Sequence, residues 1–173
     1  MPLNIESLSA TFTVRQLHAS DIDRIYDLCA ENKIFYQYHP PFVTRERILQ
    51  DLEALPPGKD ISDKFYIGFF DAQTLVAVLD LILDYPENGT DFVGFFMMNI
   101  DFQGRGTGSK IIQECSAYLK TTGCRKIRLG VDHGNPQSIA FWKKNGFQVV
   151  GEREYILMES EIKDTPSRLT PDY

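Results

Sequence analysis

Hydrophobic residues recur at helical spacing in four segments of the chain. The segments are residues 21–31, 44–55, 109–123 and 136–145. A spacing of three and four residues places these side chains on one face of a helix. Ser20, Thr44 and Asn135 are typical capping residues at the starts of segments, and Pro or Gly closes the last three. The sequence therefore predicts about four helices, each with one face turned towards a core.

Segments of a different texture lie between and after these helices. They are rich in Val, Ile, Leu and Phe and are separated by turn residues, as expected of short strands. The predicted strands are residues 65–70, 75–83, 92–100, 126–131, 147–150 and 155–161. The first three are joined by short connections, which favour antiparallel pairing, whereas a helix joins the third to the fourth in a β-α-β crossover. The sequence therefore predicts an α/β fold whose mixed sheet is antiparallel in its first half.

The length of 173 residues points to a single domain. We expect that domain to span residues 1–163. The last ten residues, 164–173, contain Pro166 and Pro171 and have no hydrophobic pattern, so we expect a loosely ordered tail.

Charge and cysteine content narrow the class of protein. The formal net charge is −6, the wrong sign for a surface that binds nucleic acid or anionic lipid. The sequence shows no basic leader and no run of ~18 apolar residues, so neither secretion nor a membrane span is indicated. We therefore expect a cytoplasmic protein. The three cysteines form no CxxC pair and lie near no His cluster, so neither a disulfide framework nor a metal site is predicted.

The most informative segment is a glycine-rich loop between the strand at 92–100 and the next helix. Gly104, Gly106 and Gly108 alternate with polar residues and lead directly into the helix. Such a loop aims backbone N–H groups and the positive end of the helix dipole at one point, which suits a phosphate or pyrophosphate. Arg105 adds a cation. The alternative interpretation is a tight turn that needs glycine for positive φ and binds nothing.

Two familiar phosphate loops do not match this segment. A Walker A loop requires Ser or Thr where Ile111 stands, and a dinucleotide GxGxxG loop requires glycine where Ser109 or Ile111 stands. Asp132, at the end of the next strand, keeps a nucleotide- or NAD-binding protein open as an alternative.

A second motif follows the strand at 126–131. Asn135 and Pro136 are typical of the first positions of a helix, and Gly146 is typical of its end. Taken alone, Phe141 and Trp142 would be read as a core-facing helix surface.

Together, in this order, the two motifs resemble those of the GCN5-related N-acetyltransferase (GNAT) family. Residues 103–108 match the family's acyl-CoA signature Q/R-x-x-G-x-G/A, and residues 135–147 are similar to its N-x-x-A-x-x-x-Y-x-x-x-G-F segment. The resemblance implies a GNAT-like fold in which a bulge splays the strand at 92–100 from the strand at 126–131. It also implies acetyl-CoA as co-substrate and transfer of its acetyl group to a primary amine by direct attack in a ternary complex.

The same resemblance implies where coenzyme A would bind. The loop would wrap the pyrophosphate, the end of the preceding strand would pair with the pantetheine arm, and the helix after Asn135 would line its other side. The residues expected to bind coenzyme A are Met98, Asn99, Ile100, Gln103, Gly104, Arg105, Gly106, Thr107, Gly108, Ser109, Asn135, Ser138, Phe141 and Trp142.

Acetyl transfer also needs groups that handle charge and protons. A backbone N–H freed by the bulge, that of Met98, could stabilise the tetrahedral oxyanion. Asp80 and Asp91 are the leading candidates for a base, with Asp84 and His133 also open.

The leaving thiolate then needs a proton. The family's motif has tyrosine where this chain has Trp142, whose indole N–H has no useful acidity. Water, the substrate ammonium or Tyr155 would supply that proton instead.

The sequence indicates least about the acceptor amine. The resemblance would bring the aromatic residues of the stretch 35–42 to the acceptor side, and aromatic rings with a net negative surface suit a cationic amine of a small molecule or peptide. A homodimer is an option for the assembly. A different class of function, an acyl-CoA-binding or sensing module without catalysis, stays open because of Trp142.

Overall fold

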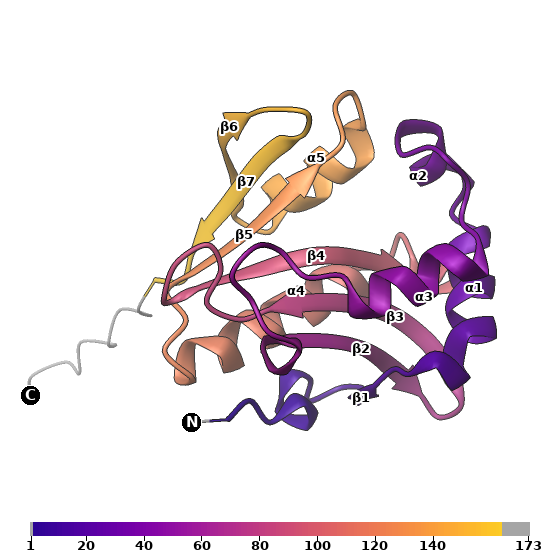
Figure 1. Cartoon of the computed structure of the whole chain (residues 1–173), viewed down its shortest axis with the longest axis horizontal. Helices are drawn as coiled ribbons and strands as arrows, with labels where there is room; N and C mark the ends of the chain where they lie inside the picture. Colours follow the sequence, from indigo (N-terminus) through magenta and orange to yellow (C-terminus); the bar gives the residue numbers. More distant parts are fainter. Residues whose placement is uncertain (1, 164–173) are drawn as a thin grey trace, which may run out of the picture.

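Seven strands form one sheet in the computed structural model, which describes residues 2–163. The strands are β1 (Thr13–Gln16), β2 (Lys64–Asp71), β3 (Thr74–Ile82), β4 (Thr90–Met98), β5 (Lys126–Val131), β6 (Gln148–Glu152) and β7 (Ile156–Glu161). Their order in the sheet is β1-β2-β3-β4-β5-β7-β6 (Figure 1). Only the β4–β5 pair is parallel within this sheet, so the predicted mixed topology with an antiparallel first half is confirmed.

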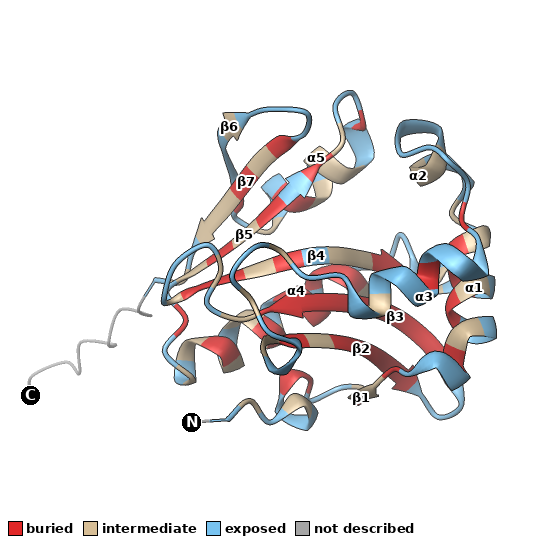
Figure 2. Cartoon of the chain, in the orientation of Figure 1, coloured by how far each residue is buried: buried red, intermediate tan, exposed pale blue. Residues whose placement is uncertain are grey.

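Helices cover both faces of the sheet. They are α1 (Ile22–Ala30), α2 (Lys33–Tyr38), α3 (Arg45–Glu53), α4 (Thr107–Thr121) and α5 (Pro136–Lys144). Apolar side chains of α1 and α3 form a core cluster with one face of β2, β3 and β4, and those of α4 and α5 form a second with the opposite face. Figure 2 shows the buried central strands between these layers. None of the helices in residues 2–163 has the length and apolar content needed to cross a membrane.

The four predicted helices correspond to α1, α3, α4 and α5, while α2 and β1 were not predicted. Helix α2 has no buried residue, so it carries no amphipathic pattern that a sequence could reveal. Strand β1 has four residues and pairs only with β2 in the described sheet. The predicted tail, residues 164–173, lies outside the described residues.

A bulge and a short parallel ladder open the sheet between β4 and β5. The β4–β5 register runs only from Thr90↔Lys126 to Val93↔Leu129. On the other side of β4, Asp80 pairs with Phe95 and Leu81 with Val93, so Gly94 is the extra residue of a bulge. Beyond Val93 the two strands diverge. The predicted bulge therefore exists, but it lies at Gly94 rather than at the end of the strand near Met98.

Candidate functional site

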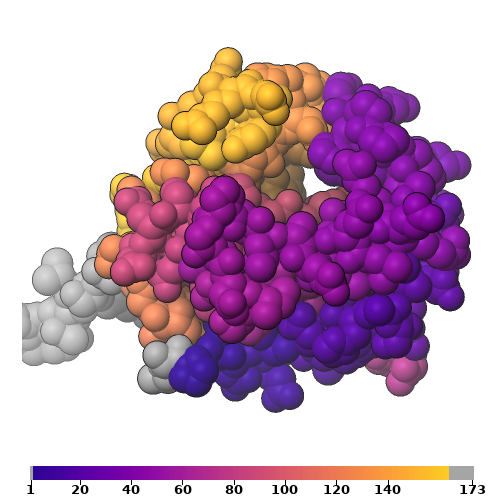
Figure 3. All heavy atoms as spheres, in the orientation of Figure 1, coloured from indigo at the N-terminus to yellow at the C-terminus, as the bar shows by residue number. Residues whose placement is uncertain are grey.

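A cleft of about 1120 Å³ lies where β4 and β5 diverge. The glycine loop and α5 line one side, and α1, α2 and α3 line the other. Figure 3 shows the molecule hollowed between the segment around α2 and the C-terminal strands. Because the opening passes between two strands, groups from both faces of the sheet meet in it. A two-part ligand could therefore enter from the two faces.

The glycine loop presents free backbone donors to this cleft. Gly104 and Gly106 have φ of 76° and 79°, and Gly106 caps the N-terminus of the 15-residue helix α4. The N–H of Lys110 is bonded to the carbonyl of Gly106, so the amides of residues 107–109 precede the first intrahelical bond. Those amides and the positive end of the helix dipole make the loop a site for an anion such as a phosphate.

Most of the predicted loop residues line the cleft, but Arg105 does not. Gln103, Gly104, Gly106, Thr107, Gly108 and Ser109 contribute to the lining. The guanidinium group of Arg105 instead donates to the carbonyl of Asp101 and lies 5.1 Å above the ring of Phe102. Arg105 thus stabilises the loop from outside the cleft.

The end of β4 exposes backbone groups to the gap. Asn99 N–H donates to Val76 O at 2.8 Å, and Met98 pairs with Ala77. Because bonded and non-bonded pairs alternate in an antiparallel ladder, the N–H and C=O groups of Met98 and Phe96 point away from β3 and into the gap. The N–H of Met98 therefore faces the gap, but it does so because β5 has turned away and not because of a bulge at this position.

An amide network, which the sequence analysis missed, fixes this end of β4. The carbonyl of Met98 accepts hydrogen bonds from Asn32 Nδ2 at 3.0 Å and from Gln103 Nε2 at 3.1 Å. Gln103 Nε2 also donates to Asn32 Oδ1 at 2.7 Å. Asn32 thereby ties the segment after α1 to the glycine loop. No local pattern marks this role of Asn32, because Met98 and Gln103 lie 66 and 71 positions away and only its bond to Leu28 O is local.

Asn99 and Ile100 do not continue the strand as predicted. The Asn99 side chain accepts the N–H of Asp101 at 2.9 Å and donates to Leu75 O at 3.1 Å, so it caps a 3₁₀ turn over Ile100–Phe102. Asn99 is absent from the lining of the cleft, whereas Ile100 lines it. The strand stops at Met98 because the Asn99 side chain, in place of a neighbouring strand, accepts the N–H of Asp101.

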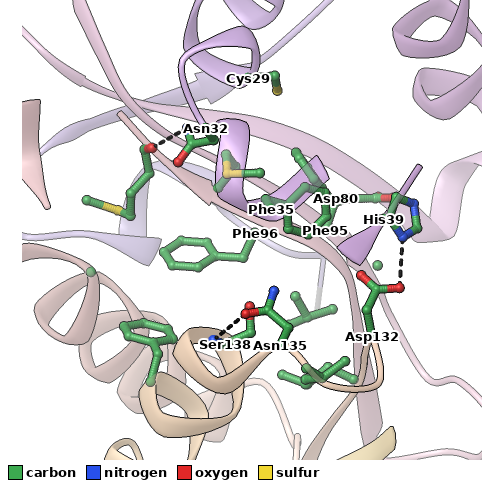
Figure 4. A pocket seen from close by; sticks show the side chains of 18 of the residues that line it. Cys29, Asn32, Phe35, His39, Asp80, Phe95, Phe96, Asp132, Asn135 and Ser138 are labelled. Carbon is green, nitrogen blue, oxygen red and sulfur yellow. Dashed lines mark hydrogen bonds and ion pairs between the residues drawn. The ribbon is translucent and has the colours of Figure 1, made fainter. Parts of the chain in front are cut away.

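Helix α5 contributes one free polar group and an aromatic wall. Asn135, only 2% exposed, caps the helix by accepting the N–H of Ser138 at 3.2 Å. Its Nδ2 amide has no hydrogen-bond partner among the described residues, and Figure 4 shows that amide directed into the cleft. The Phe141 ring stacks on Phe96 at 5.9 Å. An extended chain carrying amide groups could lie along this wall.

Trp142 lines the cleft but belongs mainly to the core. It is 7% exposed, and its ring packs edge-on against Phe141, Phe96 and Phe147 at 4.9 to 5.8 Å. Tyr155 also lines the cleft and lies against Gly130 of β5.

Of the four predicted base candidates, only Asp80 reaches the cleft. Both of its carboxylate oxygens accept from Lys64 Nζ at 2.8 Å, and the pair is almost fully buried. Burial raises the pKa of the Asp80 carboxyl, although the Lys64 ammonium opposes this rise. Asp80 faces Gly94, where a Cβ atom would lie 2.8 Å from Asp80 Oδ2.

The other three candidates lie outside the lining of the cleft. Asp91 accepts the N–H of Asp84 at 3.0 Å, and Asp84 accepts the N–H of Gly89 at 2.7 Å, so both carboxylates hold the β3–β4 hairpin. His133 bonds through Nε2 to the carbonyl of Arg153 at 2.8 Å. All three fulfil local structural roles.

The aromatic stretch is divided between the cleft and the surface. Phe35, Tyr36 and His39 line the cleft, whereas Tyr38 and Phe42 are exposed outside it. His39 Nδ1 lies 2.9 Å from Asp132 Oδ1.

Within residues 2–163 no cluster of three or more His, Cys, Asp or Glu side chains could hold a metal ion.

Comparison with known proteins agrees with this geometry. The family model "Acetyltransferase (GNAT) family" matches residues 22–147. An acetyltransferase from Thermus thermophilus superposes with a TM-score of 0.71 at 25% identity, covering 86% of this chain and 94% of that one. The PaiA N-acetyltransferase from Thermoplasma acidophilum, solved in complex with coenzyme A, gives 0.65 at 18% identity, with 87% and 99% covered.

A third solved structure is the ribosomal-protein-S18-alanine N-acetyltransferase from Escherichia coli. It superposes with a TM-score of 0.63 at 15% identity, covering 91% of this chain and 98% of that one. No curated protein sequence gives a significant match. Since the family model covers most of the chain and the predicted motifs lie on the cleft, the chain belongs to the acetyltransferase (GNAT) family, a family of acetyl-CoA-dependent N-acetyltransferases.

Proposed function

We propose that this protein transfers the acetyl group of acetyl-CoA to a primary amine of a small molecule or peptide by direct attack in a ternary complex. The observation that carries the proposal is the gap between β4 and β5, which opens beside the free amides of the α4 N-terminus. One end of the cleft suits a pyrophosphate, and the other is lined by aromatic rings and carboxylates. Acetyl-CoA supplies the thioester that the amine attacks.

The residues of the cleft fit the chemical parts of coenzyme A. Residues 107–109 offer backbone N–H groups to the pyrophosphate. The N–H group of Met98 and the free Nδ2 amide of Asn135 offer donors to the carbonyl oxygens of the pantetheine arm. Ser138 and Phe141 line the same path. In this proposal the arm completes the sheet where β5 turns away from β4.

Backbone donors at the gap would also serve the transfer step. When the amine adds to the thioester carbonyl, charge develops on the oxygen, and a preorganised N–H stabilises it without a rearrangement. We assign this role to the N–H of Phe96, which lies nearer to the bulge at Gly94. Met98 N–H, predicted for this role from the sequence, lies nearer to the glycine loop and serves the pantetheine arm. We assign Asp80 no part as the base, because both of its oxygens are already engaged by Lys64, whose positive charge offsets that of the carboxylate.

The protonation state of the Cys29 thiol favours direct attack over a covalent acetyl-enzyme. Cys29 lines the cleft, but burial raises its pKa to about 11, so the thiol stays protonated at neutral pH. A protonated thiol is a poor nucleophile towards a thioester. The acceptor amine is then the nucleophile.

Acetyl-CoA should raise the melting temperature more than NAD or ATP at equal concentration. A ligand that binds only the folded state stabilises it by mass action, and the loop matches the acyl-CoA signature but neither nucleotide signature. Differential scanning fluorimetry with the three ligands measures this. Stabilisation by NAD or ATP equal to that by acetyl-CoA would contradict the assignment.

Release of free CoA in the presence of amines tests the reaction itself. We would use a panel of 1,4-diaminobutane, 2-phenylethylamine, lysine and a peptide with a free N-terminal alanine. Amine-dependent CoA release is expected with at least one class. Stabilisation by acetyl-CoA without release for any amine would favour the non-catalytic acyl-CoA-binding module.

Substitution Trp142→Tyr should change kcat by no more than a few-fold. Trp142 packs in the core, and a thiol has a pKa near ~8.5, so the leaving thiolate needs little help from an acid. General-acid assistance is worth about 10² to 10⁴-fold. A rise of a hundredfold or more in kcat, with acetyl-CoA affinity unchanged, would show that the missing phenol limits the enzyme.

A further inference from the structure

An imidazole and a carboxylate meet across the acceptor side of the cleft. His39 caps the C-terminus of α2, and Asp132 follows the last residue of β5. His39 Nδ1 lies 2.9 Å from Asp132 Oδ1, and both residues line the cleft. Figure 4 shows the two side chains pointing towards each other from opposite sides. The pair therefore joins the acceptor wall to the strand that flanks the gap.

This contact fixes which nitrogen of His39 is free. An ionised carboxylate can only accept hydrogen bonds, so Asp132 requires a proton on Nδ1. The neutral imidazole then carries its lone pair on Nε2. That atom has no hydrogen-bond partner among residues 2–163. An imidazole oriented by a carboxylate, with its second nitrogen open, has the arrangement of a general base.

The surroundings hold the imidazole on the acceptor side of the gap. The backbone N–H of His39 donates to Phe35 O at 3.0 Å, and the His39 ring lies 5.3 Å from the ring of Phe35. Phe35 in turn contacts Phe95 at 6.0 Å, and Phe95 is the residue that follows the bulge at Gly94. His39 is thus connected by ring packing to the point where β4 and β5 separate.

We infer that His39 Nε2 is the general base that removes a proton from the acceptor ammonium, and that Asp132 is the positioning residue for His39. The inference rests on the proposed acetyl transfer. Nε2 takes one proton from R–NH₃⁺, and the neutral amine adds to the thioester carbon. The C–S bond then breaks, the CoA thiolate takes the second ammonium proton, and the imidazolium returns the first to water.

Charged groups around His39 favour this cycle. Asp132 faces it from the β5–α5 loop, and Asp51 interacts with it electrostatically from α3, with Arg47 beside Asp51. The two carboxylates attract a cationic acceptor to the nitrogen that deprotonates it.

The pH dependence of kcat/KM for the best amine of the panel tests the inference. Imidazole is the side chain that changes charge between pH 5 and 8, so the wild-type enzyme should lose kcat/KM on the acid side of neutrality. At pH 7, His39→Gln should reduce kcat about 100-fold or more. In the variant the break near neutrality should disappear, so that kcat/KM keeps rising with pH towards the pKa of the amine itself, ~10.4 for a lysine-like ammonium. Its acetyl-CoA affinity should stay unchanged. Asp132→Asn should reduce kcat in the same direction.

His133→Gln provides the matched control. His133 is adjacent to Asp132 but bonds to Arg153 O outside the cleft, so this variant should keep the wild-type rate and pH profile. Two results would overturn the inference: a His39→Gln variant whose kcat/KM still levels off near neutrality, or one in which only KM for the amine rises. If the wild-type protein turns over no amine, the proposed function fails first.

Discussion

Gly106→Val should weaken acetyl-CoA binding roughly 100-fold without unfolding the protein. Gly106 lies at the start of α4, and a Cβ atom there would meet no protein atom within 4 Å. The added side chain would instead project into the space that a phosphate needs to reach the loop amides. Losing about two charge-assisted hydrogen bonds at roughly 1.5 kcal/mol each corresponds to this factor. Isothermal titration calorimetry with acetyl-CoA measures it.

Gly58→Val is the matched control for Gly106→Val. Gly58 has φ of 81°, against 79° at Gly106, and a Cβ atom there also meets nothing within 4 Å. Valine at either position carries a similar backbone cost, about 1–2 kcal/mol. Only Gly106 lines the cleft. Equal affinity for acetyl-CoA in the two folded variants would place the pyrophosphate away from this loop.

Lys64→Met should lower the free energy of unfolding by about 3–5 kcal/mol, the largest stability effect we expect. The Lys64 and Asp80 side chains are 2% and 12% exposed, and the ammonium is 2.8 Å from both carboxylate oxygens. Removing one partner of a buried ion pair leaves the other charge uncompensated. Urea denaturation at pH 7 measures the change.

The deficit of Lys64→Met should shrink as the pH falls. Without Lys64, the pKa of the Asp80 carboxyl, already raised by burial, rises further above its unfolded value. The folded variant then binds more protons than the unfolded chain, so its stability falls as the pH rises through this window and recovers below it. The double substitution Lys64→Met with Asp80→Leu should restore most of the lost stability. A constant deficit from pH 4 to pH 7 would contradict an uncompensated Asp80 charge.

The parts of the fold predicted from sequence are those set by local periodicity. The apolar residues of α4 are spaced so that only a helix places them on one face. Four of them are buried as expected: Ile111, Ile112, Cys115 and Leu119. Asn135 also acts as the N-cap that its residue type favours. Helix α2 could not be predicted in this way because none of its residues is buried.

The parts missed in the site depend on contacts between distant residues. The bulge at Gly94 follows from its pairing opposite Asp80, which only the β3–β4 register reveals. His39 and Asp132 are 93 positions apart, and no local pattern pairs them. Asp91 had the right residue type and lay on the right strand, but it sits at the narrow end of the β4–β5 pair. Sequence identified the chemistry of the cleft better than it identified which carboxylates reach it.

The most direct test of acetyl transfer is to measure CoA release and N-acetylated amine in the same reaction mixture, while both substrates are varied. The proposed mechanism predicts that both products form at the same amine-dependent rate and that the double-reciprocal lines intersect, because acetyl-CoA and amine must be bound together. Release of CoA without acetylated amine, or parallel lines that indicate an acetyl-enzyme, would contradict it.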